Sequence, residues 1–87
     1  MTDSNTSADA RERLIQAGID IFAEYGFTAT TTRMLADKAQ VNLSAIPYYF
    51  RSKEGLYNAT VGHIADVLAD HLTPFLDRLQ AEAAKGF

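Results

Sequence analysis

The feature that most constrains this chain is a run of two short helical segments joined by a tight turn, in residues 31–50. Small apolar residues recur at helical spacing in the first segment, which lets a second helix cross closely over it. They are Leu35, Ala36 and Ala39. Asn42 is a suitable N-cap for the second segment, whose apolar face is formed by Ile46 and Phe50. The pattern predicts a helix-turn-helix of the kind that reads DNA.

Two helices this short need further packing partners, and the chain supplies one on each side. Upstream, the spacing predicts a helix from about Ala10 to Tyr25, with Asp9 and Glu12 forming a start that resembles a capping box. Gly26 ends it, since glycine adopts a left-handed conformation without strain. The apolar stripe of this predicted helix comprises Leu14, Ala17, Ile21 and Tyr25, flanked by Ile15, Gly18 and Phe22.

Downstream, Ser52 is a good N-cap for a longer helix with a continuous apolar stripe. The stripe consists of Tyr57, Val61, Ile64, Leu68, Leu72, Phe75 and Leu79. Thr73 and Pro74 have the character of an N-cap and a first-turn proline, which predicts a break and a fifth helix running toward Lys85. The stripe is longer than the first three helices can cover, so a packing partner for it is missing.

Length and composition agree with one small all-α domain. The chain has 87 residues, 47 % of them apolar, and no cysteine, so a disulfide framework and thiolate chemistry are excluded. The polar and acidic residues 1–9 lack the features of a secretion signal, and no apolar run has the length of a membrane span. We therefore expect a flexible arm over residues 1–9, a cytoplasmic location and no membrane partner.

Charge is distributed unevenly along the chain. The net charge is −3, but residues 28–53 carry four basic side chains against one acidic, a balance of +3, and the remaining residues carry four basic and ten acidic, a balance of −6. A locally positive face on an acidic body suits a surface that contacts phosphates, although solvated charges distributed by chance explain it about equally well.

Taken together, the motifs resemble the N-terminal domain of the TetR/AcrR family of transcriptional regulators. The resemblance extends from Arg11 to about Tyr57. It rests on RERLIQAGIDIFAEYGF, on Thr30 and Thr31 with Arg33, on the Leu35-Ala36 pair, on AIPYYF and on SKEGLY. Within the family, the chain is most similar to members that carry a CecR-like C-terminal domain.

The resemblance implies a three-helix, homeodomain-like head at residues 10–57, with the helix-turn-helix at 31–50. Residues 58–87 would then form a linking fourth helix and the start of a C-terminal domain that this chain lacks. It also implies a regulator, more often a repressor, that binds double-stranded DNA as a homodimer at an inverted repeat. A small-molecule effector would act through the absent domain, and no cofactor is implied.

The family's contacts transfer onto matching positions of this chain. Thr31, Arg33 and Lys53 would meet phosphates, and Tyr48 and Tyr49 would contact the DNA backbone, although Tyr48 also suits a core position. The first turn of the second segment would enter the major groove. Ser44 would bond a base edge there, and Leu43 or Ala45 would touch a thymine methyl group.

Two positions depart from the family pattern. Gln40 stands in the turn where the family usually has glycine, which costs about 1 kcal/mol if that residue is left-handed. Pro47 replaces a contacting tyrosine and lies within the second segment beyond its first turn, where it would leave the carbonyl of Leu43 without its helical partner. We therefore expect a bent or tighter helix, in which Pro47 makes van der Waals contact with sugar or methyl groups.

The residues allow two other interpretations. His63, Asp66 and Asp70, with His71 adjacent, have the chemistry of a metal site, but a solvated helix face explains them better. The stripe from Tyr57 to Leu79 also suits a helical protein-interaction module, in which the helix-turn-helix would be incidental. No motif of an enzyme appears, so we expect no catalytic activity.

Overall fold

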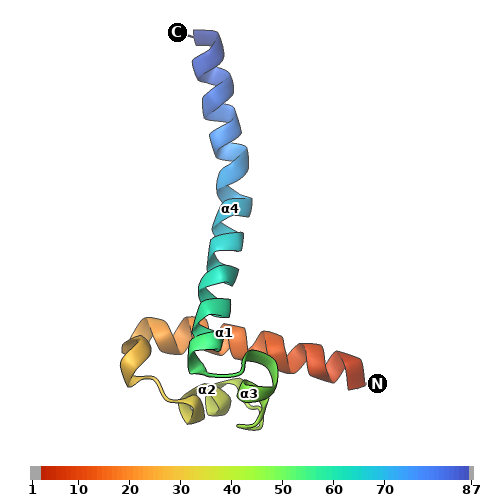
Figure 1. Ribbon diagram of the computed structural model, residues 1–87. Helices are drawn as coiled ribbons and strands as arrows, with labels where there is room; N and C mark the ends of the chain where they lie inside the picture. Colours follow the sequence, from red (N-terminus) through yellow and green to blue (C-terminus); the bar gives the residue numbers. More distant parts are fainter. Residues whose placement is uncertain (1–2, 87) are drawn as a thin grey trace.

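The computed structural model describes residues 3–86, which form four helices and no strand. They are α1 (Asp3–Ala29), α2 (Thr32–Ala39), α3 (Ala45–Phe50) and α4 (Lys53–Gly86). Helices α1, α2 and α3 pack with the start of α4 into a small head, from which the rest of α4 projects as a stalk (Figure 1). The predicted all-α class and the three-helix head are confirmed.

The head has one hydrophobic core, to which all four helices contribute. Its buried members are Leu14, Ile15, Ala17, Phe22, Leu35, Ala36, Ala39, Ile46, Phe50 and Leu56. Most residues of the stripes predicted for the first three helices are therefore core residues, but Tyr25, which was placed on the first of them, is 49 % exposed. Phe27 packs against the core from its edge, where its ring lies 6.0 Å from that of Phe22 and 5.1 Å from that of Tyr57.

Helix α1 starts earlier than its sequence predicts. It begins at Asp3 rather than near Ala10, so residues 3–9 of the expected flexible arm are helical, and residues 1 and 2 lie outside the described part. Residues 3–9 contain no glycine or proline that would interrupt a helix. Asp9 is therefore an interior residue and not an N-cap, and its carboxylate pairs with the Arg13 guanidinium at 2.9 Å.

Gly26 ends the regular part of α1 by a backbone conformation that only glycine adopts easily. Its φ of 81° is positive, as predicted, but its ψ of 168° is extended rather than left-handed helical. The kink separates residues 27–29 from the main helix. Thr30, which is almost fully buried, stabilises this kink because its hydroxyl donates to the Gly26 carbonyl at 2.6 Å.

Helix α4 crosses α1 at a point of close approach. Gly18 of α1 faces Thr60 of α4, and a Cβ at residue 18 would overlap the Thr60 hydroxyl oxygen. Thr60 is 3 % exposed, and its hydroxyl donates to the Leu56 carbonyl at 2.8 Å. The crossing anchors the first turns of α4 on the head.

The predicted break at Thr73 and Pro74 is wrong, because α4 continues through both residues and no separate fifth helix exists in residues 53–86. The Thr73 hydroxyl donates to the Ala69 carbonyl at 2.7 Å, so it acts as an interior residue rather than as a cap. Beyond the head, the apolar side chains of α4 are exposed. They include Val61, Ile64, Val67, Leu68, Leu72, Phe75, Leu76 and Leu79.

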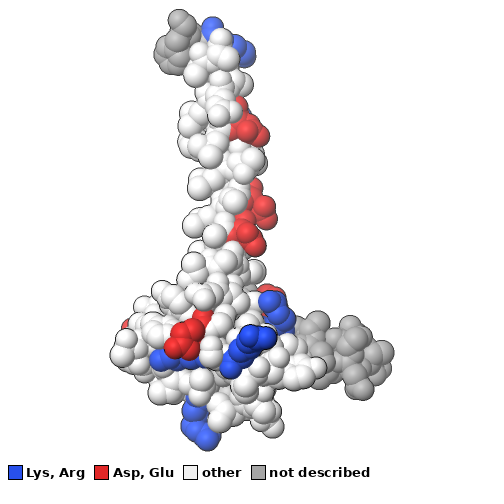
Figure 2. All heavy atoms as spheres, in the orientation of Figure 1, with Lys and Arg blue, Asp and Glu red and all other residues white. Residues whose placement is uncertain are grey.

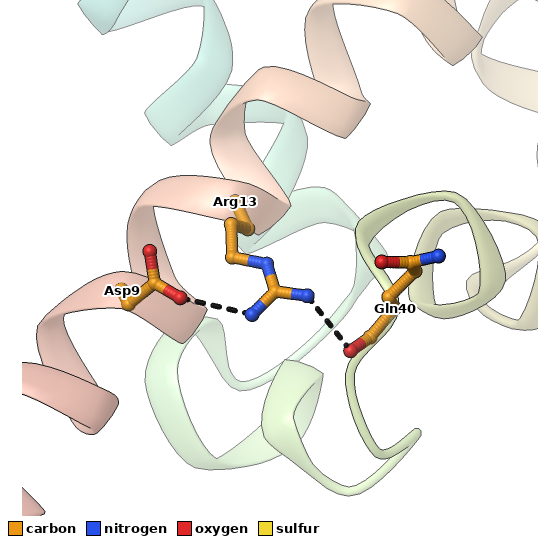
Figure 3. Close-up of polar contacts among 3 residues, drawn as sticks. All are labelled: Asp9, Arg13 and Gln40. Carbon is orange, nitrogen blue, oxygen red and sulfur yellow. Dashed lines mark hydrogen bonds and ion pairs between the residues drawn. The ribbon is translucent and has the colours of Figure 1, made fainter.

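The turn between α2 and α3 depends on Gln40, which adopts the left-handed conformation with φ 58° and ψ 47°. Its backbone N–H donates to the carbonyls of Ala36 and Asp37 and so closes α2. The Gln40 carbonyl in turn accepts a bond of 3.2 Å from Arg13, the residue that pairs with Asp9 (Figure 3). A side chain of α1 thereby fixes the turn.

Because only the backbone of Gln40 is used in this turn, we expect Gln40→Gly to raise the free energy of unfolding by about 1 kcal/mol, the strain of a left-handed non-glycine residue. Gln40→Ala is the matched control, since alanine keeps the strain. Chemical denaturation of both variants tests this. Equal stabilities for the two would show that the left-handed conformation costs nothing here.

Candidate nucleic-acid interface

The start of α2 is a well-formed helix cap at the molecular surface. Thr31 is the N-cap, and its hydroxyl oxygen accepts from the Met34 N–H at 3.1 Å, while its own N–H points to the Met34 sulfur at 3.4 Å. Arg33, in the first turn, is exposed. Two of the residues expected at phosphates thus lie side by side at one helix end.

The start of α3 is held by Asn42. Its side-chain oxygen accepts from both the N–H and the hydroxyl of Ser44, each at 3.0 Å. Helix α3 begins only at Ala45 with Ser44 as its N-cap, so the helix starts two residues later than predicted. Asn42 nevertheless accepts a free backbone N–H, which is the role that its side chain suggested.

Pro47 lies in the first turn of α3, as its third residue, and not beyond it as predicted. An N–H at this position has no partner within the helix, so proline costs no hydrogen bond here. The Leu43 carbonyl accepts from the Ile46 N–H at 3.2 Å, and the Asn42 carbonyl from the Ala45 N–H at 2.9 Å. These three-residue spacings belong to the turn that leads into α3. Beside Pro47 itself, the Tyr48 N–H donates to the Ser44 carbonyl at the four-residue spacing of an α-helix, so the tighter helix expected there is limited to this approach.

The residues expected at the DNA divide into an exposed and a half-buried set. Leu43 and Tyr48 are 39 % and 79 % exposed, and Ser44 and Pro47 are exposed as well. The high exposure of Tyr48 excludes a core position for this residue. Ala45 and Tyr49 are half-buried and pack against the core, so they offer less surface than predicted.

A shallow depression of about 500 Å³ lies between the starts of α2, α3 and α4. It is lined by Thr32, Asn42, Leu43, Ser44, Ile46, Pro47, Arg51 and Ser52. Three predicted contact residues therefore lie together here, namely Leu43, Ser44 and Pro47. Thr32 and Arg51, which the sequence analysis did not single out, lie beside them.

Arg51 is the most notable of the missed residues. It connects α3 to α4 with a φ of 76°, a conformation that a residue other than glycine rarely adopts, and its N–H donates to the Pro47 carbonyl at 3.1 Å. Its side chain is exposed beside the depression. The sequence feature that could have identified Arg51 is its place as a basic residue directly before the N-cap Ser52. The Ser52 hydroxyl accepts from the Gly55 N–H at 3.1 Å.

Lys53 makes more contacts within the protein than its expected phosphate contact would suggest. Its ammonium group donates to the carbonyls of Phe27 and Thr30, both at 2.9 Å, and lies 4.3 Å from the centre of the Phe27 ring. An ammonium group has three N–H donors, so one is left for a phosphate. Lys53 thus connects the start of α4 to the segment before α2.

Charge is distributed differently over the head and the stalk. On the head, basic side chains are visible with acidic ones beside them, whereas acidic side chains follow one side of α4 and basic ones lie near its far end (Figure 2). The four basic residues of segment 28–53 are Arg33, Lys38, Arg51 and Lys53. The charged side chains are therefore distributed unevenly over the structure as well as along the sequence.

The described residues contain neither a metal centre nor a membrane-spanning helix. No three His, Cys, Asp or Glu side chains in this part of the chain are placed to share a metal ion. His71, one of the candidate ligands, has its Nδ1 within 2.9 Å of the Val67 carbonyl. None of the helices in residues 3–86 is long and apolar enough to cross a membrane.

The head is a helix-turn-helix domain whose second helix, α3, presents an exposed face beside basic side chains. A family model for bacterial regulatory proteins of the tetR family matches residues 14–60, more than half of the chain. The chain belongs to this family.

Curated relatives agree with the assignment. The chain is 42 % identical over 71 residues to the HTH-type transcriptional dual regulator CecR of Shigella flexneri, 32 % over 74 residues to the regulator RutR of Escherichia coli K12, and 37 % over 71 residues to the regulator BetI of Klebsiella pneumoniae. The matches cover 82 %, 85 % and 82 % of this chain. They cover 31 %, 35 % and 35 % of the relatives, so the chain spans about a third of their length.

Proposed function

We propose that the intact protein is a sequence-specific, double-stranded DNA-binding regulator of transcription. The observation that carries this proposal is the exposed face of α3, which lies beside basic side chains within a domain of the tetR family. In this arrangement α3 enters the major groove, and the residues around it contact the phosphates on either side.

The surface offers two kinds of contact to a duplex. In the proposed complex, Thr31 and Arg33 at the start of α2 contact phosphates, as do Arg51 and the remaining donor of Lys53 at the start of α4. These contacts position the protein without reading sequence. Base reading then depends on the exposed first turn of α3.

The proposal extends to a homodimer that acts as an effector-responsive repressor. The exposed apolar stripe of α4 supports the homodimer, because a stripe of this length needs packing partners that residues 3–86 do not supply. In the proposed arrangement α4 connects the head, residues 10–57, to a ligand-binding and dimerising domain. The same stripe also supports the second candidate, a module that binds a partner helix.

A two-fold dimer has to meet two half-sites related by the same symmetry, so we expect the intact protein to select an inverted repeat from random duplex DNA. Footprints on the selected duplex should show two symmetric protected blocks, and binding should weaken steeply as salt is raised. Arg33→Ala should weaken binding further. An asymmetric single site would exclude the dimer, and absence of any enriched sequence would favour the protein-interaction module.

A further inference from the structure

We infer that Arg51 binds a DNA phosphate from a backbone conformation that suits glycine better, so that the head gives up folding stability for DNA affinity at this position. The role assigned to Arg51 rests on the proposed function and adds to it a conflict between stability and binding at one residue. The fold requires a positive φ there, which favours glycine, whereas the phosphate requires a guanidinium. The chain carries the residue that suits binding.

Arg51 has a backbone conformation that residues other than glycine adopt with strain. Its φ is 76° and its ψ is −43°. Gln40, the other non-glycine residue with a positive φ in residues 3–86, has a ψ of 47° and lies in the ordinary left-handed region, whereas Arg51 lies outside it. Strained residues of this kind concentrate at binding and catalytic sites, where the surrounding structure holds them in place.

The close packing of the corner between α3 and α4 imposes this conformation. Only Arg51 and Ser52 connect the two helices, and the Arg51 N–H closes α3 by donating to the Pro47 carbonyl at 3.1 Å. On the other side of the corner, Gly55 approaches the Phe50 carbonyl so closely that a Cβ at residue 55 would overlap it. The chain has little room to turn differently, so the fold needs a positive φ at residue 51. Glycine is the residue that adopts one without strain.

The guanidinium of Arg51 does not compensate for this strain by contacts within the protein. Its side chain is exposed, and within the described part of the chain it forms no ion pair and no hydrogen bond. Other cations of the head are engaged, since Arg13 donates to the Gln40 carbonyl and Lys53 donates to two backbone carbonyls. Packing and hydrogen bonding therefore give no reason for an arginine at residue 51, and an external partner does.

The surroundings of Arg51 suit a phosphate as that partner. Arg51 lines the depression beside Ser44 and Pro47, and none of the residues that line it is acidic. A guanidinium presents a planar fork of N–H donors that matches two oxygens of a phosphate. In the proposed complex α3 lies in the major groove, so the residue directly after α3 meets the sugar-phosphate backbone at the edge of that groove.

The test compares two replacements of Arg51 in the intact protein, with a duplex selected from random DNA. Arg51→Ala removes the guanidinium and keeps the strain, whereas Arg51→Gly removes both. We expect both variants to bind about tenfold more weakly than the wild type, with the slope of log affinity against log salt lower by about one unit per head and with sequence preference unchanged. In thermal unfolding without DNA, Arg51→Gly should melt about 3 °C above both the wild type and Arg51→Ala.

Two further variants serve as controls. Lys38→Ala removes an exposed cation of segment 28–53 that does not line the depression, so it should leave affinity and salt slope nearly unchanged. Arg51→Lys keeps the charge and should keep the salt slope. Selective binding with an unchanged salt slope in Arg51→Ala would overturn the role of Arg51 alone, as would an Arg51→Gly variant no more stable than the wild type. Failure of the wild type to select any sequence would refute the proposed function.

Discussion

Replacing Lys53 by methionine is expected to lower the free energy of unfolding by about 2 kcal/mol. Methionine keeps the apolar part of the side chain near the Phe27 ring but removes both donors to the carbonyls of Phe27 and Thr30. Hydrogen bonds from charged groups are worth about 1.5–3 kcal/mol each, and partial exposure of Lys53 reduces their sum. Lys38→Met, at an exposed position in the last turn of α2, is the control and should change stability little.

The same variant separates a structural role from a DNA contact. If the third donor of Lys53 meets a phosphate, Lys53→Met should lower the slope of log affinity against log salt by about one unit per head, with sequence preference unchanged. Unfolding curves and binding isotherms at several salt concentrations measure both effects. Stability equal to that of Lys38→Met would contradict the carbonyl contacts, and an unchanged salt slope would confine Lys53 to its structural role.

A valine at position 18 is expected to destabilise the head by about 3 kcal/mol, because its Cβ would overlap the Thr60 hydroxyl oxygen where α1 and α4 cross. The Thr60 side chain opposite is buried and hydrogen-bonded, so it has little freedom to move aside. Gly62→Val is the matched control. A Cβ there would meet no atom within 4 Å, and that variant should fold as well as the wild type.

Thermal unfolding of the two valine variants measures this difference. Gly18→Val should also expose the first turns of α4, which hydrogen exchange would detect as faster exchange in residues 53–60. Similar melting temperatures for Gly18→Val and Gly62→Val would show that α1 and α4 do not approach as closely as the structure places them.

Local signals in the sequence predicted the head well. Helical spacing identified Leu35 and its neighbours as core, Gly26 marked the end of regular helix, and Ser52 was found as the cap of α4. Each of these features depends on residues within one or two turns of chain. The same local reasoning located Pro47 in the recognition helix and its tighter start, but not its place in the first turn.

Features that depend on distant partners could not be read from the sequence. The two carbonyls that Lys53 contacts lie 26 and 23 residues upstream, and Arg13 reaches Gln40 across 27 residues. Helix α4 continues through Pro74, and within residues 3–86 the apolar side chains around it are exposed. The contact residues for DNA remain predictions, since their test needs the duplex.

The most direct test of the DNA interface is a titration of the intact, isotope-labelled protein with its selected duplex, followed by amide chemical shifts. The proposed interface predicts large changes at residues 31–33, 42–48 and 51–53, reduced in Arg33→Ala. A scrambled duplex should give weaker changes that salt removes. Changes confined to α4 beyond Val61, with none at α3, would contradict a helix-turn-helix that reads DNA.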